Sequence, residues 1–329
     1  MNLPTPLLVR SPNWLGDAVM TMPAVANLRK LLGREPLTVA APASIAPLWE
    51  MCPFVDVVIA LDHPKKLWHS SRQLSNKGFR SAVLFLNSLR TALEARLAGI
   101  PTIIGYGGRG REWLGVRTIK RRSFDFQSLH QKNDWLHLVA ACGADSQESP
   151  IHWQLQFELT EQTIQNPIII CPGAEYGPAK CWPEDYYVIL AQQLISRYSL
   201  PILFMGTKSD ASLGAHLAQR VPGSINLCGK TTLQEFIFRL ARARLVICND
   251  SGGMHLAGIL RIPTIAIFGS TEPRLTGPLG NTVRVLRHHV PCGPCFLRHC
   301  PLDFSCMTGI LPAHVLTVCD DLMGMGTLA

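Results

Sequence analysis

The chain has 329 residues, of which 47% are hydrophobic and 16% are charged, a composition typical of a globular protein with a large core. One ordinary core does not extend over so long a chain, so we expect two domains. No apolar run reaches the ~20 residues that span a bilayer, and residues 1–6 lack the basic and apolar regions of a signal peptide. These features predict a cytoplasmic protein whose 11 cysteines are mostly reduced thiols.

The net charge of +8 indicates an anionic partner. Nucleic acid, a phosphorylated substrate and an anionic membrane surface all fit this charge. The basic residues are concentrated in one short segment, which also carries Trp113, Leu114 and Phe124. Its cationic members are Arg109, Arg111, Arg117, Lys120, Arg121 and Arg122.

Short apolar runs alternate with longer helical patterns through the first half of the chain, which predicts a parallel sheet with crossover helices. We expect strands at residues 7–10, 37–41, 55–60, 81–86 and 102–104. The helical patterns between them cover residues 25–32, 65–76 and 91–97. This order of elements favours a doubly wound α/β domain.

A further helical pattern at 132–142 precedes a polar, proline-marked stretch at 143–167, in which we place the domain boundary near residue 158. A second alternation follows, with strands at 168–171, 202–205, 224–227, 245–248 and 264–268, and helices at 182–197, 209–220, 232–241 and 253–260. The sequence thus predicts two doubly wound domains, residues 1–158 and 159–329, with a ligand cleft between them. Ligand contacts are expected in the loops at the carboxyl ends of the strands.

The stretch from Asn249 to His255 follows a β-branched run and leads into a helix of small residues. A polar, glycine-containing turn at a helix N-terminus exposes backbone N–H groups, and the helix dipole favours an anion there. This pattern predicts a phosphate site. The alternative is that Asp250 or Ser251 only caps the helix.

Three other motifs carry less information. The G-x-G-x-x-G pattern at 105–110 is not followed by a small-residue helix, so we expect a flexible basic loop there, not a dinucleotide site. Residues 206–209 resemble the end of a P-loop without its first glycine, and we expect a strand-end turn. The spacing of four cysteines could hold a structural zinc ion, but it is shorter than in zinc ribbons, so free thiols are expected at Cys292, Cys295, Cys300 and Cys306.

Three loops are predicted to converge on one site. The first runs from Ser11 to Asp17, and Asp17 either caps the following helix or acts as a base on a substrate hydroxyl. The second, residues 172–183, presents Lys180 as a point charge suited to phosphate, with Tyr176 and Trp182 as neighbours. The third is the opening turn at 249–255, joined by residues 268–273, which add hydroxyls and the Gly269 amide.

These three stretches, in order and spacing, resemble the ADP-heptose:lipopolysaccharide heptosyltransferases, with the heptosyltransferase II subgroup the most similar. The run Cys292-Gly-Pro-Cys-Phe-x-Arg-x-Cys-Pro also looks like that subgroup, and the resemblance covers nearly the whole chain. It implies the GT-B architecture, two Rossmann-like domains around a cleft. It also implies that the carboxy-terminal domain holds ADP-heptose and the amino-terminal domain holds the lipid-linked core acceptor.

The resemblance also implies roles for individual residues. Asp17 matches the general base of an inverting transfer, and Lys180 matches a lysine that binds the donor diphosphate. The expected donor-binding residues are Gly173, Ala174, Asp250, Ser251, Gly252, Gly253, His255 and Gly269. The residues expected to face the acceptor or a membrane are Asn13, Arg109, Arg111, Arg121 and Arg122.

An anionic, lipid-linked acceptor would explain the positive charge of the basic segment. Arginine and lysine interleaved with Trp113 and Leu114 also suit the inner face of the cytoplasmic membrane. The alternative is a solvated loop with excess charge. No Asp-x-Asp pair is needed for the transfer, so no metal or other cofactor is expected to be required. No nucleic-acid partner is expected either.

The sequence departs from the family at Gly253, where relatives often carry a larger residue, and at Cys181, which replaces a frequently basic position. The acidic residue that contacts the nucleoside in some relatives has no clear match among residues 208–210. Two alternatives therefore stay open. One is a related glycosyltransferase, including heptosyltransferase I, with another donor or acceptor. The other is a non-catalytic nucleotide- or nucleic-acid-binding module, although an aromatic surface for stacking bases is not evident.

Overall fold

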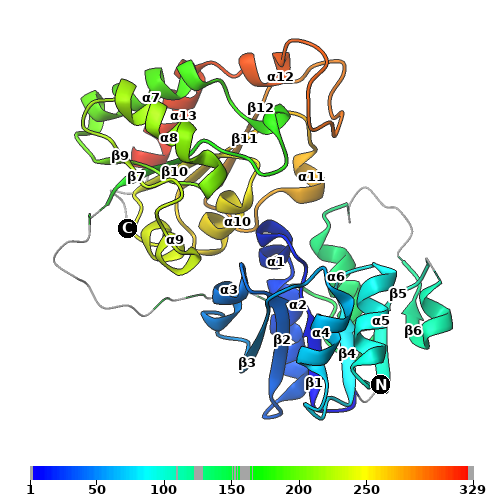
Figure 1. The fold of residues 1–329 in the computed structure, drawn as a ribbon. Helices are drawn as coiled ribbons and strands as arrows, with labels where there is room; N and C mark the ends of the chain where they lie inside the picture. The colour runs from blue at the N-terminus through cyan, green and yellow to red at the C-terminus, as the bar shows by residue number, and fades with distance from the viewer. Residues whose placement is uncertain are drawn as a thin grey trace. The chain divides into compact units, whose positions relative to one another are not determined.

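The computed structural model describes residues 3–108, 110–121, 129–149, 151, 153, 155, 164 and 166–324. The chain divides into two compact units, Met1–Trp153 and Gln154–Ala329. Within the described residues each unit is built on a parallel six-stranded sheet with helices on both faces (Figure 1). The predicted fold class, two doubly wound α/β halves in series, is confirmed.

The first sheet has the strand order β3-β2-β1-β4-β5-β6. The order reverses between β1 and β4, and ligands of open α/β sheets bind beyond the carboxyl ends of the strands at such a switch point. Its strands are β1 (Leu7–Arg10), β2 (Leu37–Pro42), β3 (Val57–Leu61), β4 (Ser81–Leu84), β5 (Thr102–Tyr106) and β6 (Val116–Ile119).

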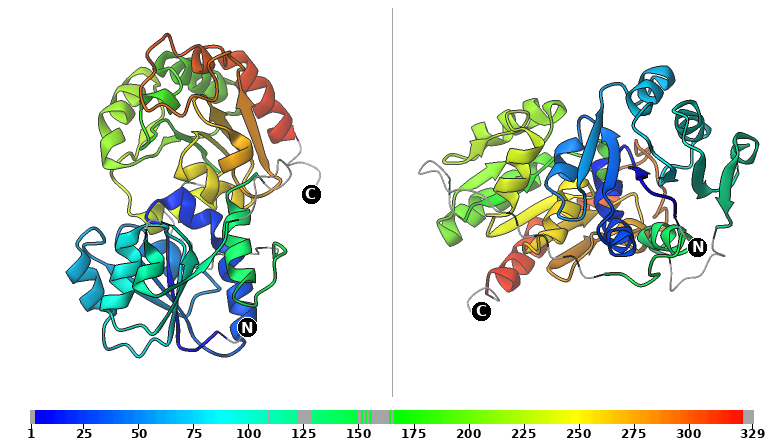
Figure 2. Two further views of the ribbon diagram at one scale, coloured as in Figure 1. Left: turned by 90° about the vertical axis from the view of Figure 1, so that its right-hand side faces the viewer. Right: turned by 90° about the horizontal axis from the view of Figure 1, so that it is seen from below.

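The helices of the first unit pack in two groups on the sheet, α2 beside α6 and α4 beside α5 (Figure 2). A core under the second group joins Leu8 and Leu84 of the sheet to Ala92 and Ala95 of α5. The helices are α1 (Leu15–Met20), α2 (Met22–Leu32), α3 (Ala46–Glu50), α4 (Leu67–Leu74), α5 (Leu89–Leu97), a 3-10 turn (Arg111–Leu114) and α6 (Lys132–Ala140).

The second sheet has the order β12-β11-β10-β7-β8-β9, which repeats the topology of the first and reverses between β7 and β10. Ile168 and Ile170 of β7 and Ile247 of β10 pack against α7 in a continuous buried core. Both faces are covered, so these strands read as uninterrupted apolar runs. The strands are β7 (Ile168–Cys171), β8 (Ile202–Phe204), β9 (Ile225–Asn226), β10 (Leu245–Asn249), β11 (Thr264–Phe268) and β12 (Val283–Arg287).

The helices of the second unit also form two groups: α7 packs with α8 and α13, and α9 packs with α10 (Figure 1). They are α7 (Glu184–Tyr198), α8 (Ala211–Arg220), α9 (Leu233–Leu240), α10 (Gly252–Ile259), α11 (Pro273–Thr276), α12 (Ser305–Thr308) and α13 (Pro312–Gly324). Among the described residues no helix is both long and apolar enough to cross a membrane.

The sequence reasoning missed β6, β12, α13 and the short helices α3, α11 and α12. β6 lies in the basic segment and pairs in parallel with β5, with Val116 opposite Ile103. β12 is likewise an edge strand, in which Arg284 and Arg287 interrupt the apolar run. Charged residues on edge strands protect them from pairing with another chain. Because these charges interrupt the apolar run, the sequence pattern does not predict the two strands.

Candidate functional site

Asn249 fixes the loop between β7 and α7 at the switch point of the second sheet. Its side chain is fully buried, and its Nδ2 donates to the carbonyl oxygen of Pro172 at 2.6 Å. Its Oδ1 accepts from the backbone N–H of Trp182 at 3.1 Å and from the Tyr187 hydroxyl at 2.8 Å. One amide therefore holds both ends of the loop that carries Lys180, because Pro172 and Trp182 lie on either side of it.

Lys180 is held inside the unit and does not extend into solvent. Its Nζ lies 2.5 Å from Oδ2 of Asp250, and the two side chains are 12% and 4% exposed. The same carboxylate oxygen accepts from the Thr271 hydroxyl, and Nζ also lies 4.7 Å from the centre of the Tyr176 ring. This geometry holds the ammonium at the carboxyl end of the sheet as part of an ion pair.

The N-terminus of α10 starts beside this charge. Ser251 is the N-cap residue in an extended conformation, but its side chain makes no capping hydrogen bond. The alternative role of Asp250 or Ser251 as a side-chain cap is therefore wrong, and Asp250 pairs with Lys180 instead. The first backbone N–H groups of the helix, at Gly252 and Gly253, have no side-chain cap and carry the positive end of the helix dipole.

Gly253 and His255 are buried in α10. A Cβ atom at Gly253 would meet Cys171 Sγ at 3.5 Å, an ordinary contact, so close packing does not require glycine at this position. The predicted contact of both residues with the donor stays a prediction.

Asp210 explains why Gly173 is glycine. A Cβ atom at Gly173 would come within 2.0 Å of Asp210 Oδ1. Asp210 itself completes a capping box, in which its Oδ2 accepts from the backbone N–H of Thr207 at 2.7 Å. The sequence reasoning left Asp210 without a role, although the T-x-x-D spacing of a capping box was present in the chain. Ala174 starts the next turn, where its carbonyl oxygen accepts from the Gly177 N–H at 3.2 Å.

Gly269 follows β11 and lies against α12. A Cβ atom there would approach Met307 Sδ to 2.4 Å, so packing alone requires glycine at this position. Two residues further on, Thr271 contributes its hydroxyl to Asp250. The predicted hydroxyls of this loop therefore act on the carboxylate beside Lys180, and a direct contact of Gly269 with the donor stays a prediction.

The four-cysteine loop packs against the Lys180 loop. The Tyr176 hydroxyl donates to the Phe296 carbonyl at 2.6 Å, and the Ala179 N–H donates to the Arg298 carbonyl at 3.1 Å. All four thiols are free and line one cavity of about 570 Å³: Cys292, Cys295, Cys300 and Cys306. In the part of the chain that the structure describes, no three His, Cys, Asp or Glu side chains are arranged to hold a metal ion.

In the first unit, the loop from Ser11 to Asp17 leaves β1 at the switch point of the sheet. Helix α1 begins at Leu15 with Trp14 as its N-cap, so the alternative role of Asp17 as the N-cap is wrong. Asp17 lies within the first helical turn and is partly exposed. Asn13 is also partly exposed, and its Oδ1 accepts from Nη2 of Arg10 at 3.3 Å.

The basic residues of the first unit separate into two kinds. Arg111 is fully buried, so its predicted contact with a membrane is wrong, and burial lowers the pKa of its guanidinium. Its Nη1 donates to the Tyr106 carbonyl at 2.8 Å, whereas Nε and Nη2 have no hydrogen-bond partner among the described residues. Arg121 is exposed and lies 5.5 Å from the Tyr106 ring centre. Arg109 and Arg122 lie outside the described residues.

Comparison with known proteins identifies the family. Residues 67–305 match the model of glycosyltransferase family 9 (heptosyltransferase). The chain is 30% identical over 315 residues to lipopolysaccharide heptosyltransferase 2 of Escherichia coli, covering 85% of this chain and 87% of that protein. It is 29% identical over 307 residues to the protein of the same name from Salmonella typhimurium, with the same coverage.

A solved structure gives the same result. The structure of Escherichia coli ADP-heptose lipopolysaccharide heptosyltransferase II superimposes with a TM-score of 0.80 at 26% identity, covering 99% of this chain and all of that one. The two doubly wound units thus have the GT-B architecture of these enzymes. A non-catalytic nucleic-acid-binding module is not favoured. The chain is a glycosyltransferase and belongs to glycosyltransferase family 9, the heptosyltransferase family.

Proposed function

We propose that this enzyme transfers heptose from ADP-heptose to a heptose of the lipopolysaccharide inner core, as a heptosyltransferase II. The observation that supports this most directly is the pairing of Lys180 with Asp250 beside the uncapped N-terminus of α10. A cation and helix amides together suit the diphosphate of a nucleotide sugar. The names of the relatives at about 30% identity support the choice of sugar and acceptor.

In the proposed reaction, the Asp17 carboxylate removes the proton from a hydroxyl group of the acceptor heptose. That oxygen attacks the anomeric carbon from the face opposite the diphosphate, so the new glycosidic bond forms with inversion. The bond from the anomeric carbon to the phosphate oxygen breaks, and its electron pair leaves with ADP. Lys180 and the amides of Gly252 and Gly253 stabilise the charge that develops on the departing phosphate. No cofactor takes part.

We propose that the first unit binds the anionic acceptor, because its basic segment keeps exposed cationic side chains at Arg117, Lys120 and Arg121. Trp113, which is 93% exposed, and the nearby exposed Arg121 would contact the inner face of the cytoplasmic membrane. Arg109 and Arg122 are proposed to add positive charge there.

The test is release of ADP from ADP-heptose in the presence of core acceptors that carry either no heptose or one heptose. We expect turnover only with the one-heptose acceptor. Turnover only with the heptose-free acceptor would assign the chain to heptosyltransferase I. No turnover with either acceptor, from enzyme that binds another nucleotide sugar, would refute the proposed donor.

The base is tested by Asp17→Asn, with Asp62→Asn as a control. Asp62 also follows a strand of the same sheet, but it is exposed and accepts a hydrogen bond from the Gln73 side chain. General base catalysis contributes about 10²- to 10⁴-fold. Asp17→Asn should therefore lower kcat by at least about 10²-fold while the KM for ADP-heptose stays nearly constant. Equal kcat in both variants would remove Asp17 from this role.

The membrane contact is tested with Arg121→Glu and purified vesicles. We expect the wild-type enzyme to bind vesicles that contain an anionic phospholipid and to bind neutral ones weakly, with the variant losing this preference. If the variant and the wild type bind anionic vesicles equally, the segment is a solvated basic surface.

A further inference from the structure

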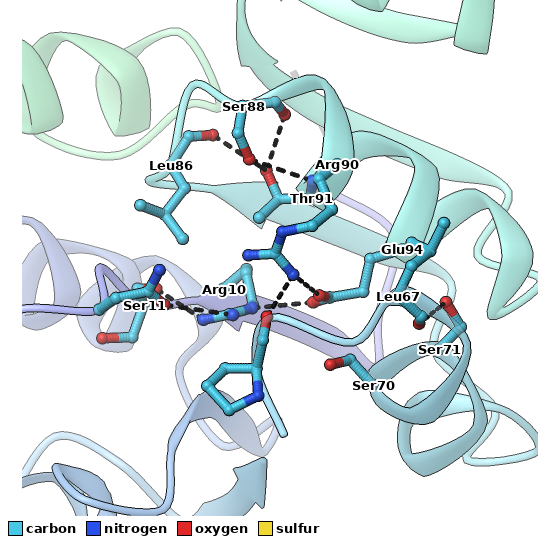
Figure 3. A network of polar contacts seen from close by, with 12 residues as sticks. Arg10, Ser11, Leu67, Ser70, Ser71, Leu86, Ser88, Arg90, Thr91 and Glu94 are labelled. Atoms are coloured by element: carbon cyan, nitrogen blue, oxygen red, sulfur yellow. Dashed lines mark hydrogen bonds and ion pairs between the residues drawn. The ribbon is translucent and has the colours of Figure 1, made fainter. Parts of the chain in front are cut away.

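Arg10, the last residue of β1, is the centre of a buried polar network at the switch point of the first sheet (Figure 3). Its Nε lies 2.8 Å from Glu94 Oε1, and both side chains are only 1% exposed. A buried charge is tolerated only when it is paired and hydrogen-bonded. An arginine at this point of an otherwise apolar strand therefore requires an explanation.

Each nitrogen of the Arg10 guanidinium has a different partner. Nε donates to Glu94, Nη1 donates to the Ser11 carbonyl at 2.8 Å, and Nη2 donates to Asn13 Oδ1 at 3.3 Å. Two of the three partners belong to the loop that leads to Asp17. Arg10 thus holds this loop at a backbone atom and at a side chain, and Glu94 fixes Arg10 from the opposite side (Figure 3).

The contact with Arg10 also determines how the Asn13 amide is turned. A guanidinium has only donors, so the atom of Asn13 that meets it must be the amide oxygen. Because the amide is planar, its Nδ2 group then points away from Arg10. Asn13 is partly exposed, and the orientation of its N–H donors follows from the contact with Arg10.

The start of the loop is anchored in other ways as well. The Ser11 N–H donates to the Ala40 carbonyl at 3.0 Å, and the indole Nε1 of Trp49 donates to the Ser11 hydroxyl at 3.0 Å. Ser11 is therefore bound at its N–H, its hydroxyl and its carbonyl. Arg10 is the residue that extends this fixed point to Asn13, four positions before Asp17.

We propose that the Arg10–Glu94 pair is a positioning element for the transfer reaction, which orients Asn13 toward the acceptor sugar and fixes the path of the chain to Asp17. This inference rests on the proposed function. Arg10 and Glu94 do not touch the substrate, and they act through Asn13 and Asp17. The Asn13 N–H donors bind an acceptor oxygen, in the orientation that Arg10 sets.

The test compares Arg10→Lys with Arg90→Gln. Lysine keeps a positive charge beside Glu94 but lacks the planar fork that reaches Ser11 and Asn13 together. Arg90 pairs with the same carboxylate, at 3.3 Å from Nη1 to Glu94 Oε2, but is 29% exposed, and its Nη1 also donates to the Pro64 carbonyl, away from residues 11–17. It is a matched control for the loss of an ion pair at Glu94.

We expect Arg10→Lys to lower kcat and raise the KM for the acceptor, so that kcat/KM for the acceptor falls about 10- to 100-fold, the effect of a small misplacement of reacting groups. The KM for ADP-heptose should stay within about twofold, because the donor residues belong to the other unit. Arg90→Gln should leave all three constants within about twofold.

Asn13→Asp provides a second measurement that does not depend on the folding of Arg10→Lys. Aspartate keeps an oxygen for Arg10 but has no N–H donor, so the KM for the acceptor should rise about tenfold with an unchanged melting temperature. Wild-type acceptor constants in folded Arg10→Lys and in Asn13→Asp would overturn the inference. Loss of turnover in Asp17→Asn alongside that result would leave the proposed function standing, whereas full turnover in Asp17→Asn would refute the base assignment itself.

Discussion

Each unit places an ion pair near the switch point of its sheet, Arg10–Glu94 in the first and Lys180–Asp250 in the second. The two pairs differ in what their cations can bind. In the first unit, each nitrogen of Arg10 donates to a protein atom, and the pair with Glu94 is almost completely buried. In the second, the Lys180 ammonium pairs with Asp250 and keeps 12% of its side chain exposed. A planar guanidinium fixes several partners at once, whereas an ammonium is a compact charge on a flexible stem.

This difference separates a charge that holds the protein from a charge that can bind a ligand. All three nitrogens of Arg10 are occupied by its own unit, so its effect on a reaction must pass through Ser11 and Asn13. Lys180 has three donors and one carboxylate partner, and it lies beside the open end of α10. A diphosphate at that point would share Lys180 with Asp250 and add the helix amides.

The largest difference should appear in stability. Glu94→Ala leaves a buried guanidinium without its counter-charge, which costs about 3 to 5 kcal/mol in the free energy of unfolding. Asp250→Ala leaves an ammonium that is less deeply buried than the Arg10 guanidinium and still lies over the Tyr176 ring, so we expect a smaller loss of about 1 to 3 kcal/mol. Urea denaturation measures both, with each effect taken from the transition of the unit that carries the substitution. Equal losses would break the distinction between the two pairs.

The next effect concerns ligand affinity. Lys180→Ala removes a charge-assisted hydrogen bond worth about 1.5 to 3 kcal/mol, so calorimetry should show a Kd for ADP that is about 10- to 100-fold higher. Lys230→Ala is the matched control, because Lys230 is exposed in the same unit and its Nζ donates to the Asn226 carbonyl. Unchanged affinity for ADP in Lys180→Ala would show that the Lys180 charge, like that of Arg10, stabilises the fold and does not bind the ligand.

The parts of this arrangement that could be predicted from the sequence are those with a local signature. Both central strands, β1 and β7, were predicted at their observed bounds, Leu7–Arg10 and Ile168–Cys171, because buried parallel strands are continuous apolar runs. The turn at Asn249 and the lysine at 180 were found because glycine, proline and polar residues interrupt such runs. Because both follow the carboxyl end of a strand, they were expected to bind the ligand.

The residues that were missed depend on contacts between distant positions. Arg10 reads as the polar end of a strand, and only the fold brings Glu94, 84 residues away, to its side. Asp210 occupies the space over Gly173 for the same reason. Arg111 was expected to face an acceptor or a membrane because basic residues crowd its segment of the sequence, although it is fully buried. The periodicity of a single sequence does not show which residues far apart in the chain come into contact.

A third charged cluster gives the smallest effect and sharpens the comparison through its pH dependence. Glu272 lies between Arg274 and Arg287, and hydrogen bonds from Arg274 above all, with Arg287 next among the side chains, lower its pKa from 4.5 to about 2. Since the folded pKa is depressed, the stabilisation is complete above about pH 4.5 and is lost as the pH falls toward about 2. The difference in unfolding free energy between wild type and Glu272→Gln should therefore shrink by about 2 kcal/mol over that window. Glu235→Gln, at the exposed capping box of α9, should show a smaller change in the same measurement. A difference that stays constant with pH would mean that Glu272 acts through packing and not through its charge.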